Sequence, residues 1–369
     1  MKHRQFLPAD ANYSALDRYF STLGARRLML VHGRSMTRLK LGEYFKNAPA
    51  RLGFDLIEFT DFTPNPEYES IERGVEIFNR EHCDAIAAVG GGSAIDTAKC
   101  IKLFSNMNPN ANYIEQQIVP NDIAFLAAPT TGGSGSEATQ FAVIYYRDKK
   151  YSIDDSSALP DAVFFDANVL LDLPVYQKKA TLLDAFCHAV ESSWSVNAND
   201  ESRHYAREAV RLITANKNIY IDGKPDLQCC TFVMYAANLA GRAINISKTT
   251  AGHAMCYRLT KKFGLSHGHA AARCVVVLWK FMLDFALENR REDLLRIFDD
   301  LASAMNCATA EEAIAAFDRQ LDDWELNAPI DVENSLDELA SSVNLQRLAN
   351  NPVELRADDL KKLYQLIGR

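Results

Sequence analysis

The 369-residue sequence lacks the continuous apolar segments that mark membrane proteins and secretory signals. Its opening residues, MKHRQFLPADANYS, contain no apolar signal core. The longest apolar runs, such as CVVVLW at 274–279, fall far below the roughly 18 residues needed to cross a bilayer. We therefore expect a cytoplasmic protein with no membrane partner.

Cysteine pairs with redox or metal-ligand spacing are also absent. The eight cysteines are scattered without a CxxC pair, and only Cys229 and Cys230 are adjacent. This distribution is typical of reduced thiols that pack as small apolar groups. It argues against a disulfide framework and against a zinc ribbon.

The chain has no excess of positive charge. Its formal net charge is -8, from 40 Lys and Arg against 48 Asp and Glu. Nucleic acid is therefore not an expected partner, because binding it needs a concentrated surplus of cations. With 48% apolar and 24% charged residues, the chain can bury a large core, which we expect to be divided between two domains.

The two halves of the chain differ in periodicity. In the first half, short β-rich runs (RLMLVH, FDLIEF, DAIAAVG, IAFLAAPT and AVFFDA) alternate with helical segments such as ESIERGVEIFNREH. After about Pro174, long amphipathic stretches replace them. We predict an α/β dinucleotide-binding domain with a Rossmann-like parallel sheet over 1–167, and an all-helical domain over 168–369.

Glycine-rich turns follow two of the predicted strands, GGGS at 90–93 and PTTGGSGSEAT at 129–139. Backbone amides at such a turn can hold a pyrophosphate beside a helix N-terminus, although a tight turn without a ligand has the same pattern. Two such loops at the carboxyl edge of one sheet favour a dinucleotide. The first strand ends in HGRS at 32–35 without GxGxxG, so the usual Rossmann fingerprint is missing.

A metal site is indicated by one aspartate and three histidines. Asp184 and His188 are four residues apart in a helical stretch, so they project from one face. That pair alone more often forms a surface hydrogen bond. His253 and His267, in the small-residue segments AGHAMCY and GLSHGHAAA, complete a set that suits Fe(II) or Zn(II) with an open coordination position. Such a metal would polarise a carbonyl or stabilise an alkoxide beside a nicotinamide.

Four motifs resemble those of the iron-containing, or group III, alcohol dehydrogenases, and they occur in the family's order: GGGSAIDTAK, PTTGGSGSEAT, LLDAFCHAVES and HAMCYRLTKKFGLSHGHA. The positions of Asp184, His188, His253 and His267 match the family's metal ligands. The resemblance implies an NAD(P)-linked enzyme with an all-α C-terminal metal-binding domain, in the architecture shared with dehydroquinate synthase, and a metal between the domains.

The resemblance also implies which residues bind the cofactor. These are Gly91, Gly92 and Ser93 at the pyrophosphate, Thr130, Thr131 and Ser134 along the phosphate and nicotinamide, and Lys150 at a ribose. Asp96 lies near the cleft in the same pattern. For Asp96 and Lys99, a helix-face pair that packs the turn is an equal alternative.

One departure from the family concerns proton transfer. Tyr257 stands where the family often has a histidine, four residues after the third metal ligand. The phenol of Tyr257 could donate to a developing alkoxide, but its reference pKa of about 10 makes it a poor proton carrier at neutral pH. His269 is a candidate substitute, and a hydrogen-bonded core histidine is the favoured alternative.

The 2' position of the cofactor is predicted from the end of the first strand. Gly33 stands where NAD enzymes place a carboxylate, and Arg34 and Ser35 follow it. With nothing there to repel a 2'-phosphate, we expect NADPH to be accepted at least as well as NADH.

Three cations around the third metal ligand bear on the substrate: Arg242, Lys248 and Arg258. The segments HAMCYRLT and SHGHA resemble those of the phosphonoacetaldehyde reductases within this family. They imply reduction of phosphonoacetaldehyde to 2-hydroxyethylphosphonate, with the cations holding the phosphonate. For Arg258, pairing with an acidic neighbour is the favoured alternative.

Other functions stay open at this point. A glycerol-dehydrogenase-like polyol enzyme using zinc and a general short-chain alcohol dehydrogenase share the architecture. A dehydroquinate-synthase-like lyase also combines NAD with a metal, but it recycles its cofactor. The sequence does not decide between iron and zinc, between NADPH and NADH, or between a monomer and a homodimer.

Overall fold

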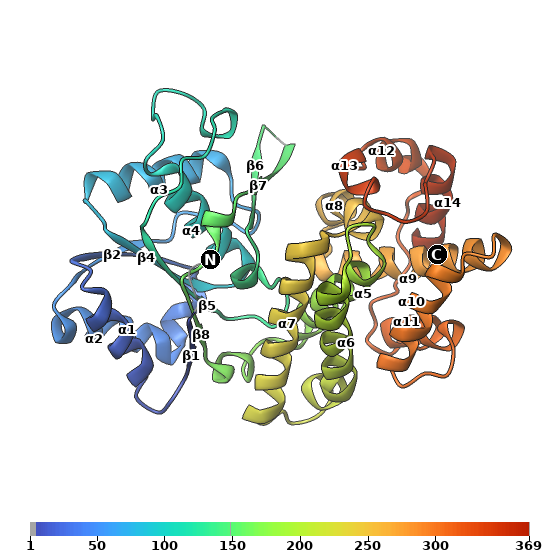
Figure 1. Ribbon diagram of the computed structural model, residues 1–369, viewed down its shortest axis with the longest axis horizontal. Coiled ribbons are helices and arrows are strands. Elements are labelled where there is room, and N and C mark those ends of the chain that lie inside the picture. Colours follow the sequence, from blue (N-terminus) through green and yellow to red (C-terminus); the bar gives the residue numbers. More distant parts are fainter. Residues whose placement is uncertain (1–4, 148, 369) are drawn as a thin grey trace. The chain divides into compact units, whose positions relative to one another are not determined.

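The computed structural model describes residues 5–147 and 149–368, which form two compact units (Figure 1). The first unit comprises the described residues up to Thr131 together with Ser136–Asp172. The second comprises Gly132–Gly135 and the described residues from Leu173 onward. The predicted boundary after residue 167 falls in the short 3-10 helix Ala167–Leu170, just before this junction.

A six-stranded sheet in the order β1-β8-β5-β4-β2-β3 forms the centre of the first unit. All of its neighbouring strands pair in parallel, which confirms the predicted α/β class. The strands are β1 (Gln5–Pro8), β2 (Arg27–His32), β3 (Asp55–Phe59), β4 (Ala85–Gly90), β5 (Ala124–Pro129) and β8 (Ala162–Phe165). Every strand expected from the sequence is present.

Two features of this unit were not predicted. The edge strand β1 has only four residues and is mostly exposed, so it carries no hydrophobic alternation. The antiparallel hairpin of β6 (Phe141–Tyr146) and β7 (Lys149–Asp154) forms a separate two-stranded sheet.

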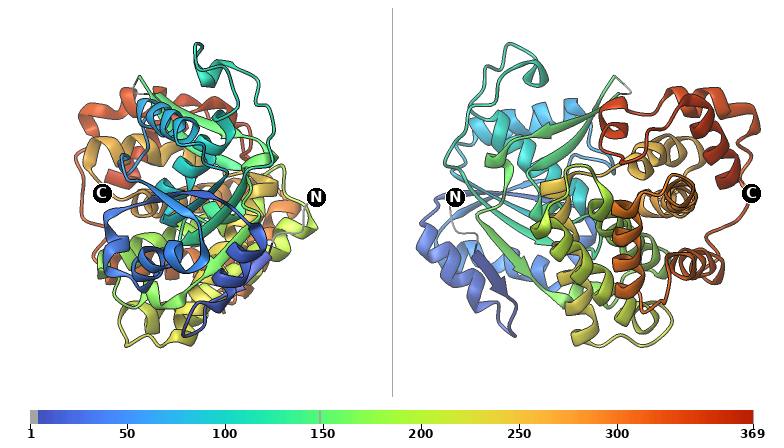
Figure 2. Two further views of the ribbon diagram at one scale, coloured as in Figure 1. Left: turned by 90° about the vertical axis from the view of Figure 1, so that its left-hand side faces the viewer. Right: turned by 45° about the vertical axis from the view of Figure 1, so that its right-hand side comes forward.

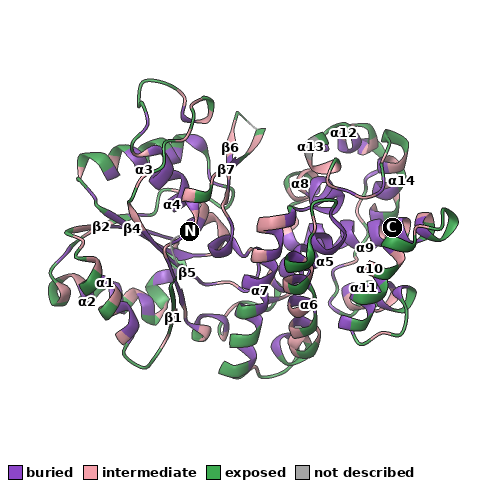
Figure 3. Ribbon diagram, in the orientation of Figure 1, coloured by how far each residue is buried: buried purple, intermediate pink, exposed green. Residues whose placement is uncertain are grey.

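Helices cover the sheet and bury its central strands. The helices of this unit are α1 (Ser14–Leu23), α2 (Lys40–Leu52), α3 (Tyr68–Arg80) and α4 (Gly92–Phe104). Residues of β4 are buried along the whole strand (Figure 3), as expected for a parallel sheet covered on both faces. This burial explains why the sequence of β4, AIAAVG, is apolar at every position and does not alternate.

All the regular elements among the described residues of the second unit are helices (Figures 1 and 2), as predicted. Its helices are α5 (Val175–Trp194), α6 (Asp200–Ile221), α7 (Leu227–Ser247), α8 (Ala251–Phe263), α9 (His267–Glu288), α10 (Glu292–Ala304), α11 (Ala310–Asp323), α12 (Leu336–Ser341), α13 (Leu345–Leu348) and α14 (Ala357–Gly368).

Helix α5 is the central element of this unit. It packs against α6, α7 and α9, and every one of its residues from Leu182 to Trp194 is buried. Trp194 lies against Trp279 and Phe298 at ring-centroid distances of 5.7 and 5.9 Å. Polar side chains on α5 are therefore held inside the protein, where they need partners. Among the described residues, no helix has the length and apolarity to span a membrane.

Candidate metal centre

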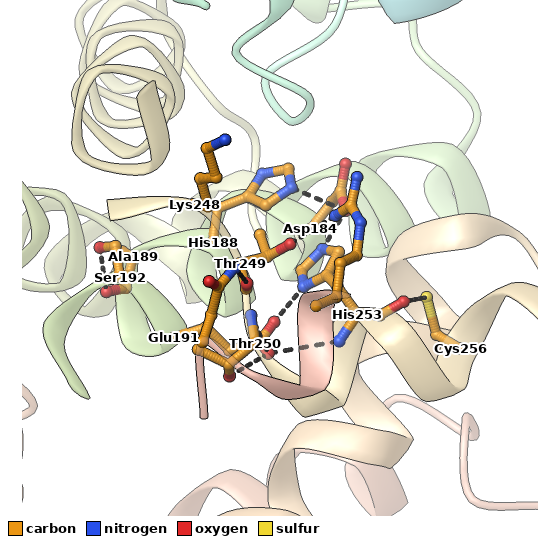
Figure 4. A network of polar contacts seen from close by, with 12 residues as sticks. Asp184, His188, Ala189, Glu191, Ser192, Lys248, Thr249, Thr250, His253 and Cys256 are labelled. Atoms are coloured by element: carbon orange, nitrogen blue, oxygen red, sulfur yellow. Dashed lines mark hydrogen bonds and ion pairs between the residues drawn. The ribbon is translucent and has the colours of Figure 1, made fainter. Parts of the chain in front are cut away.

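Three imidazoles converge on one carboxylate in the helical unit, and Figure 4 shows two of them, His188 and His253, beside Asp184. Asp184 and His188 lie one turn apart on α5, His253 lies on α8, and His267 is the first residue of α9. The Nε2 atoms of His188, His253 and His267 are 3.9, 3.5 and 3.8 Å from Oδ1 of Asp184. The structure thus brings together all four ligands inferred from the sequence.

The chemistry of this group fits a divalent cation. In the described chain, Oδ1 of Asp184 and Nε2 of His253 are buried without a hydrogen-bond partner, which is costly unless a cation lies between them. Burial acts to raise the pKa of Asp184, but the imidazoles around it hold that pKa below its ordinary value, so the carboxylate is ionised. Burial lowers the pKa of His188 to about 4, which leaves it neutral and able to act as a ligand.

Glu191 orients one of these histidines and was missed by the sequence analysis. Its fully buried carboxylate accepts from Nδ1 of His253, and also from the backbone N–H and hydroxyl of Thr250 at 3.1 and 2.6 Å (Figure 4). His253 therefore presents Nε2 toward Asp184. The signal was available, because Asp184, His188 and Glu191 recur at the spacing of one helix face.

Gly268 allows α9 to approach α5 closely. A Cβ added at Gly268 would lie 2.0 Å from the carbonyl oxygen of Ala180 and 2.6 Å from Cβ of Asp184. No side chain fits at such distances. This contact sets the position of His267, the residue before it.

The centre is most accessible at His267. Its side chain is 39% exposed, against at most 9% for the other three members. The ring of Tyr257 stacks on His267 with centroids 5.5 Å apart and an interplanar angle of 6°. Tyr257 thus borders the exposed side of the centre.

His269 occupies a hydrogen-bonded position in the core, which argues against its predicted role in proton transfer. Its Nε2 lies 2.6 Å from the carbonyl oxygen of Leu326, and its Nδ1 lies 3.1 Å from the hydroxyl of Tyr176. The carbonyl requires the ring proton on Nε2, so Nδ1 accepts from the phenol. Burial also lowers the pKa of His269, so both nitrogens are engaged in a neutral ring.

The three predicted substrate cations lie in different surroundings. Arg258 forms an ion pair with Glu338, which also accepts from Lys262 at 2.6 Å. This pairing argues against its predicted role, because its charge is already matched. The guanidinium of Arg242 lies over the ring of Tyr205 on α6, at 5.7 Å.

Lys248 has a different position, at the end of α7. It is exposed and directly precedes Thr249 and Thr250, of which Thr250 contacts Glu191. Lys248 is thus joined to the metal centre through two residues of backbone.

In the first unit, the turn after β4 lies beside Pro129–Thr131, where the second glycine-rich segment begins. Gly90 pairs with Pro129 at the ends of β4 and β5, and the N–H of Thr130 donates to the carbonyl of Gly90 at 3.0 Å. A Cβ added at Gly91 would lie 3.4 Å from the side chain of Thr131. No side chain in the described residues caps the N-terminus of α4, so the amides of Gly92 and Ser93 can bind an anion.

Asp96 and Lys99 tie α4 to the segment before and within β6. The buried Lys99 amine donates to Ser136 and Thr139 at 3.1 Å and to the carbonyl of Phe141 at 2.6 Å. Asp96 accepts from the backbone N–H of Val143 at 2.9 Å. These contacts correspond to the packing alternative.

The remaining predicted cofactor residues lie at the edges of the glycine-rich and hairpin segments. Lys150 pairs in register with Tyr145 on the hairpin. Ser134 belongs to the loop segment of the second unit. After β2, Arg34 and Ser35 are exposed, and a Cβ added at Gly33 would meet nothing within 4 Å, so this strand end has open space.

Comparison with known proteins covers nearly the whole chain. Residues 8–167 match the model of the iron-containing alcohol dehydrogenases, and residues 178–367 match the C-terminal model of the same family. The NAD-dependent methanol dehydrogenase of Bacillus methanolicus is 27% identical over 305 residues, which are 80% of this chain and 79% of that protein. The phosphonoacetaldehyde reductase of Streptomyces viridochromogenes is 30% identical over 250 residues, or 63% of this chain and 62% of that one.

The fold is also similar to that of solved structures. An iron-containing alcohol dehydrogenase from Thermococcus thioreducens superposes with a TM-score of 0.89 at 22% identity, covering 100% of this chain and 99% of that one. The two family models together cover most of both units. The C-terminal model, over residues 178–367, includes the aspartate and the three histidines of the metal centre. The chain therefore belongs to the iron-containing alcohol dehydrogenase family and is an NAD(P)-linked alcohol and aldehyde oxidoreductase.

Proposed function

We propose that this enzyme reduces phosphonoacetaldehyde to 2-hydroxyethylphosphonate, with iron held by Asp184, His188, His253 and His267. The observation that carries the proposal is the position and backbone conformation of Lys248, beside the segment that contacts the metal centre. The 30% identity to a phosphonoacetaldehyde reductase supports it.

The protein groups have distinct roles in this reaction. When bound, the divalent metal supplies Lewis acidity that polarises the aldehyde oxygen, and the reduced nicotinamide supplies hydride. Glu191 holds His253 in the tautomer that offers Nε2. Tyr257, stacked on the exposed ligand His267, is the group that we assign to hydrogen bonding with the developing alkoxide.

Lys248 adopts a backbone conformation that favours glycine. Its φ and ψ angles are 61° and 173°, a region that costs a residue with a Cβ about 1 to 3 kcal/mol. Strain of this kind persists where the surrounding structure over-determines the conformation, and it clusters at active sites and ligand-binding segments. An exposed lysine amine at this place can meet a phosphonate oxygen through a charge-assisted hydrogen bond.

Replacing Lys248 is expected to separate stability from substrate preference. Lys248→Gly and Lys248→Ala should both lose about ten- to a hundredfold in kcat/KM for phosphonoacetaldehyde and little for propanal, because each loses one charge-assisted contact. Only the glycine variant relieves the strain, so its Tm should exceed that of the alanine variant by a few degrees. Steady-state kinetics with both aldehydes and thermal unfolding measure these effects.

The alanine variant is the matched control for the loss of the side chain. Equal losses on both aldehydes, or a parent enzyme that prefers propanal, would remove the phosphonate assignment and leave a general alcohol dehydrogenase. Preference for a diol would favour a polyol dehydrogenase. Turnover without net consumption of NAD(P)H would indicate a lyase.

We further propose that the enzyme accepts NADPH at least as well as NADH. The open space at Gly33 and the exposed Arg34 and Ser35 leave room and hydrogen-bond donors for a 2'-phosphate. Arg34→Ala should lower kcat/KM for NADPH about ten- to a hundredfold and leave NADH nearly unchanged. A strong preference for NADH that is the same in parent and variant would contradict this.

A further inference from the structure

We propose that Arg347 is a second binding group for the anionic end of the substrate, acting together with Lys248 beside the metal centre. The ligand it fits is a tetrahedral oxyanion carried by a small aldehyde. This inference rests on the proposed function, which it deepens by naming a residue that the sequence motifs do not include.

A short series of contacts connects Arg347 to the metal centre. The residue lies on α13, and its guanidinium carbon is 5.3 Å from the ring centroid of Tyr257. That ring is parallel to His267, whose Nε2 lies 3.8 Å from Asp184. Arg347 is therefore one aromatic ring away from the most exposed ligand.

The guanidinium is held in place on a second side. Its Nη1 donates to the hydroxyl of Thr249 at 2.6 Å, and Asn350, on the same short segment, donates to the carbonyl of Thr249 at 3.0 Å. Thr249 directly follows Lys248 and directly precedes Thr250, which donates to Glu191. One connection between α7 and α8 thus joins Lys248, the contact to Arg347 and the support of His253.

The charge of Arg347 is not matched by a carboxylate. Within residues 5–147 and 149–368, no aspartate or glutamate forms an ion pair with it, whereas Arg258 pairs with Glu338. A partly buried cation at this position favours an anion as its partner.

The donors that remain on Arg347 suit a tetrahedral oxyanion. A guanidinium has five N–H donors in a planar fork, and Thr249 takes only one of them. Stacking on Tyr257 uses the flat face and leaves the edge available. Phosphonate and sulfonate both have oxygens that accept from such an edge in a bidentate manner. A small substrate with one methylene between its aldehyde and its oxyanion keeps the oxyanion near the metal ligands, on the side where Tyr257 and Arg347 lie.

The test compares Arg347→Gln and Arg347→Lys with the parent on phosphonoacetaldehyde, sulfoacetaldehyde and propanal. We expect Arg347→Gln to lose about ten- to a hundredfold in kcat/KM on both anionic aldehydes and little on propanal. Arg347→Lys should lose less, because it keeps the charge but not the fork. The parent's preference between the two anions identifies the physiological group.

Binding of 2-hydroxyethylphosphonate, measured by calorimetry on the metal-loaded protein, gives a readout that does not depend on turnover. Its Kd should weaken in Arg347→Gln by the same factor as kcat/KM. Arg356→Gln is the matched control, since Arg356 is an exposed arginine of the same helical unit, and it should behave like the parent. Circular dichroism shows whether each variant is folded, and Arg347→Lys tests the inference should the glutamine variant not fold.

The outcomes separate the inference from the proposed function. A parent that prefers phosphonoacetaldehyde, with that preference and the product Kd unchanged in Arg347→Gln, overturns the role of Arg347 alone. Equal losses on charged and neutral aldehydes also overturn it, and assign Arg347 to holding Tyr257 instead. A parent that prefers sulfoacetaldehyde, with that preference lost in Arg347→Gln, overturns the proposed substrate and keeps the role of Arg347. A parent that prefers neither anionic aldehyde over propanal overturns the proposed function and the inference together.

Discussion

His267→Ala is expected to lose its metal and to lower kcat/KM by more than about a hundredfold while the fold survives. Loss of a group that merely supports a ligand already costs about ten- to a hundredfold in metal affinity or activity, and His267 faces Asp184 directly at 3.8 Å. Its side chain is 39% exposed, so removing it leaves little empty space in the helical core.

Metal analysis and circular dichroism on the purified variant, beside steady-state kinetics, measure these effects. His204→Ala is the matched control, because His204 is an exposed histidine on α6 and its loss should leave metal content and turnover unchanged. Full metal occupancy with near-normal turnover in His267→Ala would refute the ligand assignment.

Gly268→Ala is expected to have an effect of similar size through the backbone. The added methyl would lie 2.0 Å from the carbonyl oxygen of Ala180 and 2.8 Å from the backbone nitrogen of Asp184, so α9 must move away from α5. Overpacking of this kind costs about 1 to 3 kcal/mol or more. Because His267 is the first residue of α9, the same movement takes its imidazole away from Asp184, and metal affinity should fall together with Tm.

Ser266→Ala is the control, because it tests whether any substitution next to His267 lowers metal affinity and Tm. Ser266 makes no side-chain cap to α9 in the described structure, and only its backbone N–H contacts the hydroxyl of Tyr176, at 3.1 Å. This variant should keep its metal and its Tm. A Gly268→Ala enzyme that binds metal as tightly as the parent would show that α9 can adjust without moving His267.

Local patterns in the sequence were sufficient for much of the fold. The parallel sheet was predicted from apolar runs such as AIAAVG, and the helical half from amphipathic periodicity, because both patterns depend on neighbours within a few residues. The edge strand β1 was missed because its exposed residues have no such pattern. The hairpin β6–β7 was missed although its first strand is apolar and β-branched.

The metal ligands were predictable for a related reason. Asp184 and His188 share a helix face by spacing alone. His253 and His267 stood out in small-residue segments, the resemblance matched all four positions, and the structure brings them to the same carboxylate. The sequence also indicated the glycine turns at Gly91 and Thr131, because the ends of neighbouring parallel strands meet at one edge of a sheet.

The sequence by itself thus determined the α/β and helical halves, the family and the four converging ligands. Tertiary structure alone decided the partners of the remaining polar side chains: Arg258 meets Glu338, His269 meets Leu326, and Arg347 meets Thr249 across 98 positions of the chain. Periodicity predicts which face of an element is buried, whereas a hydrogen bond or ion pair depends on which distant element packs against that face. That packing is set by the combined fit of many side chains, and no local pattern records it.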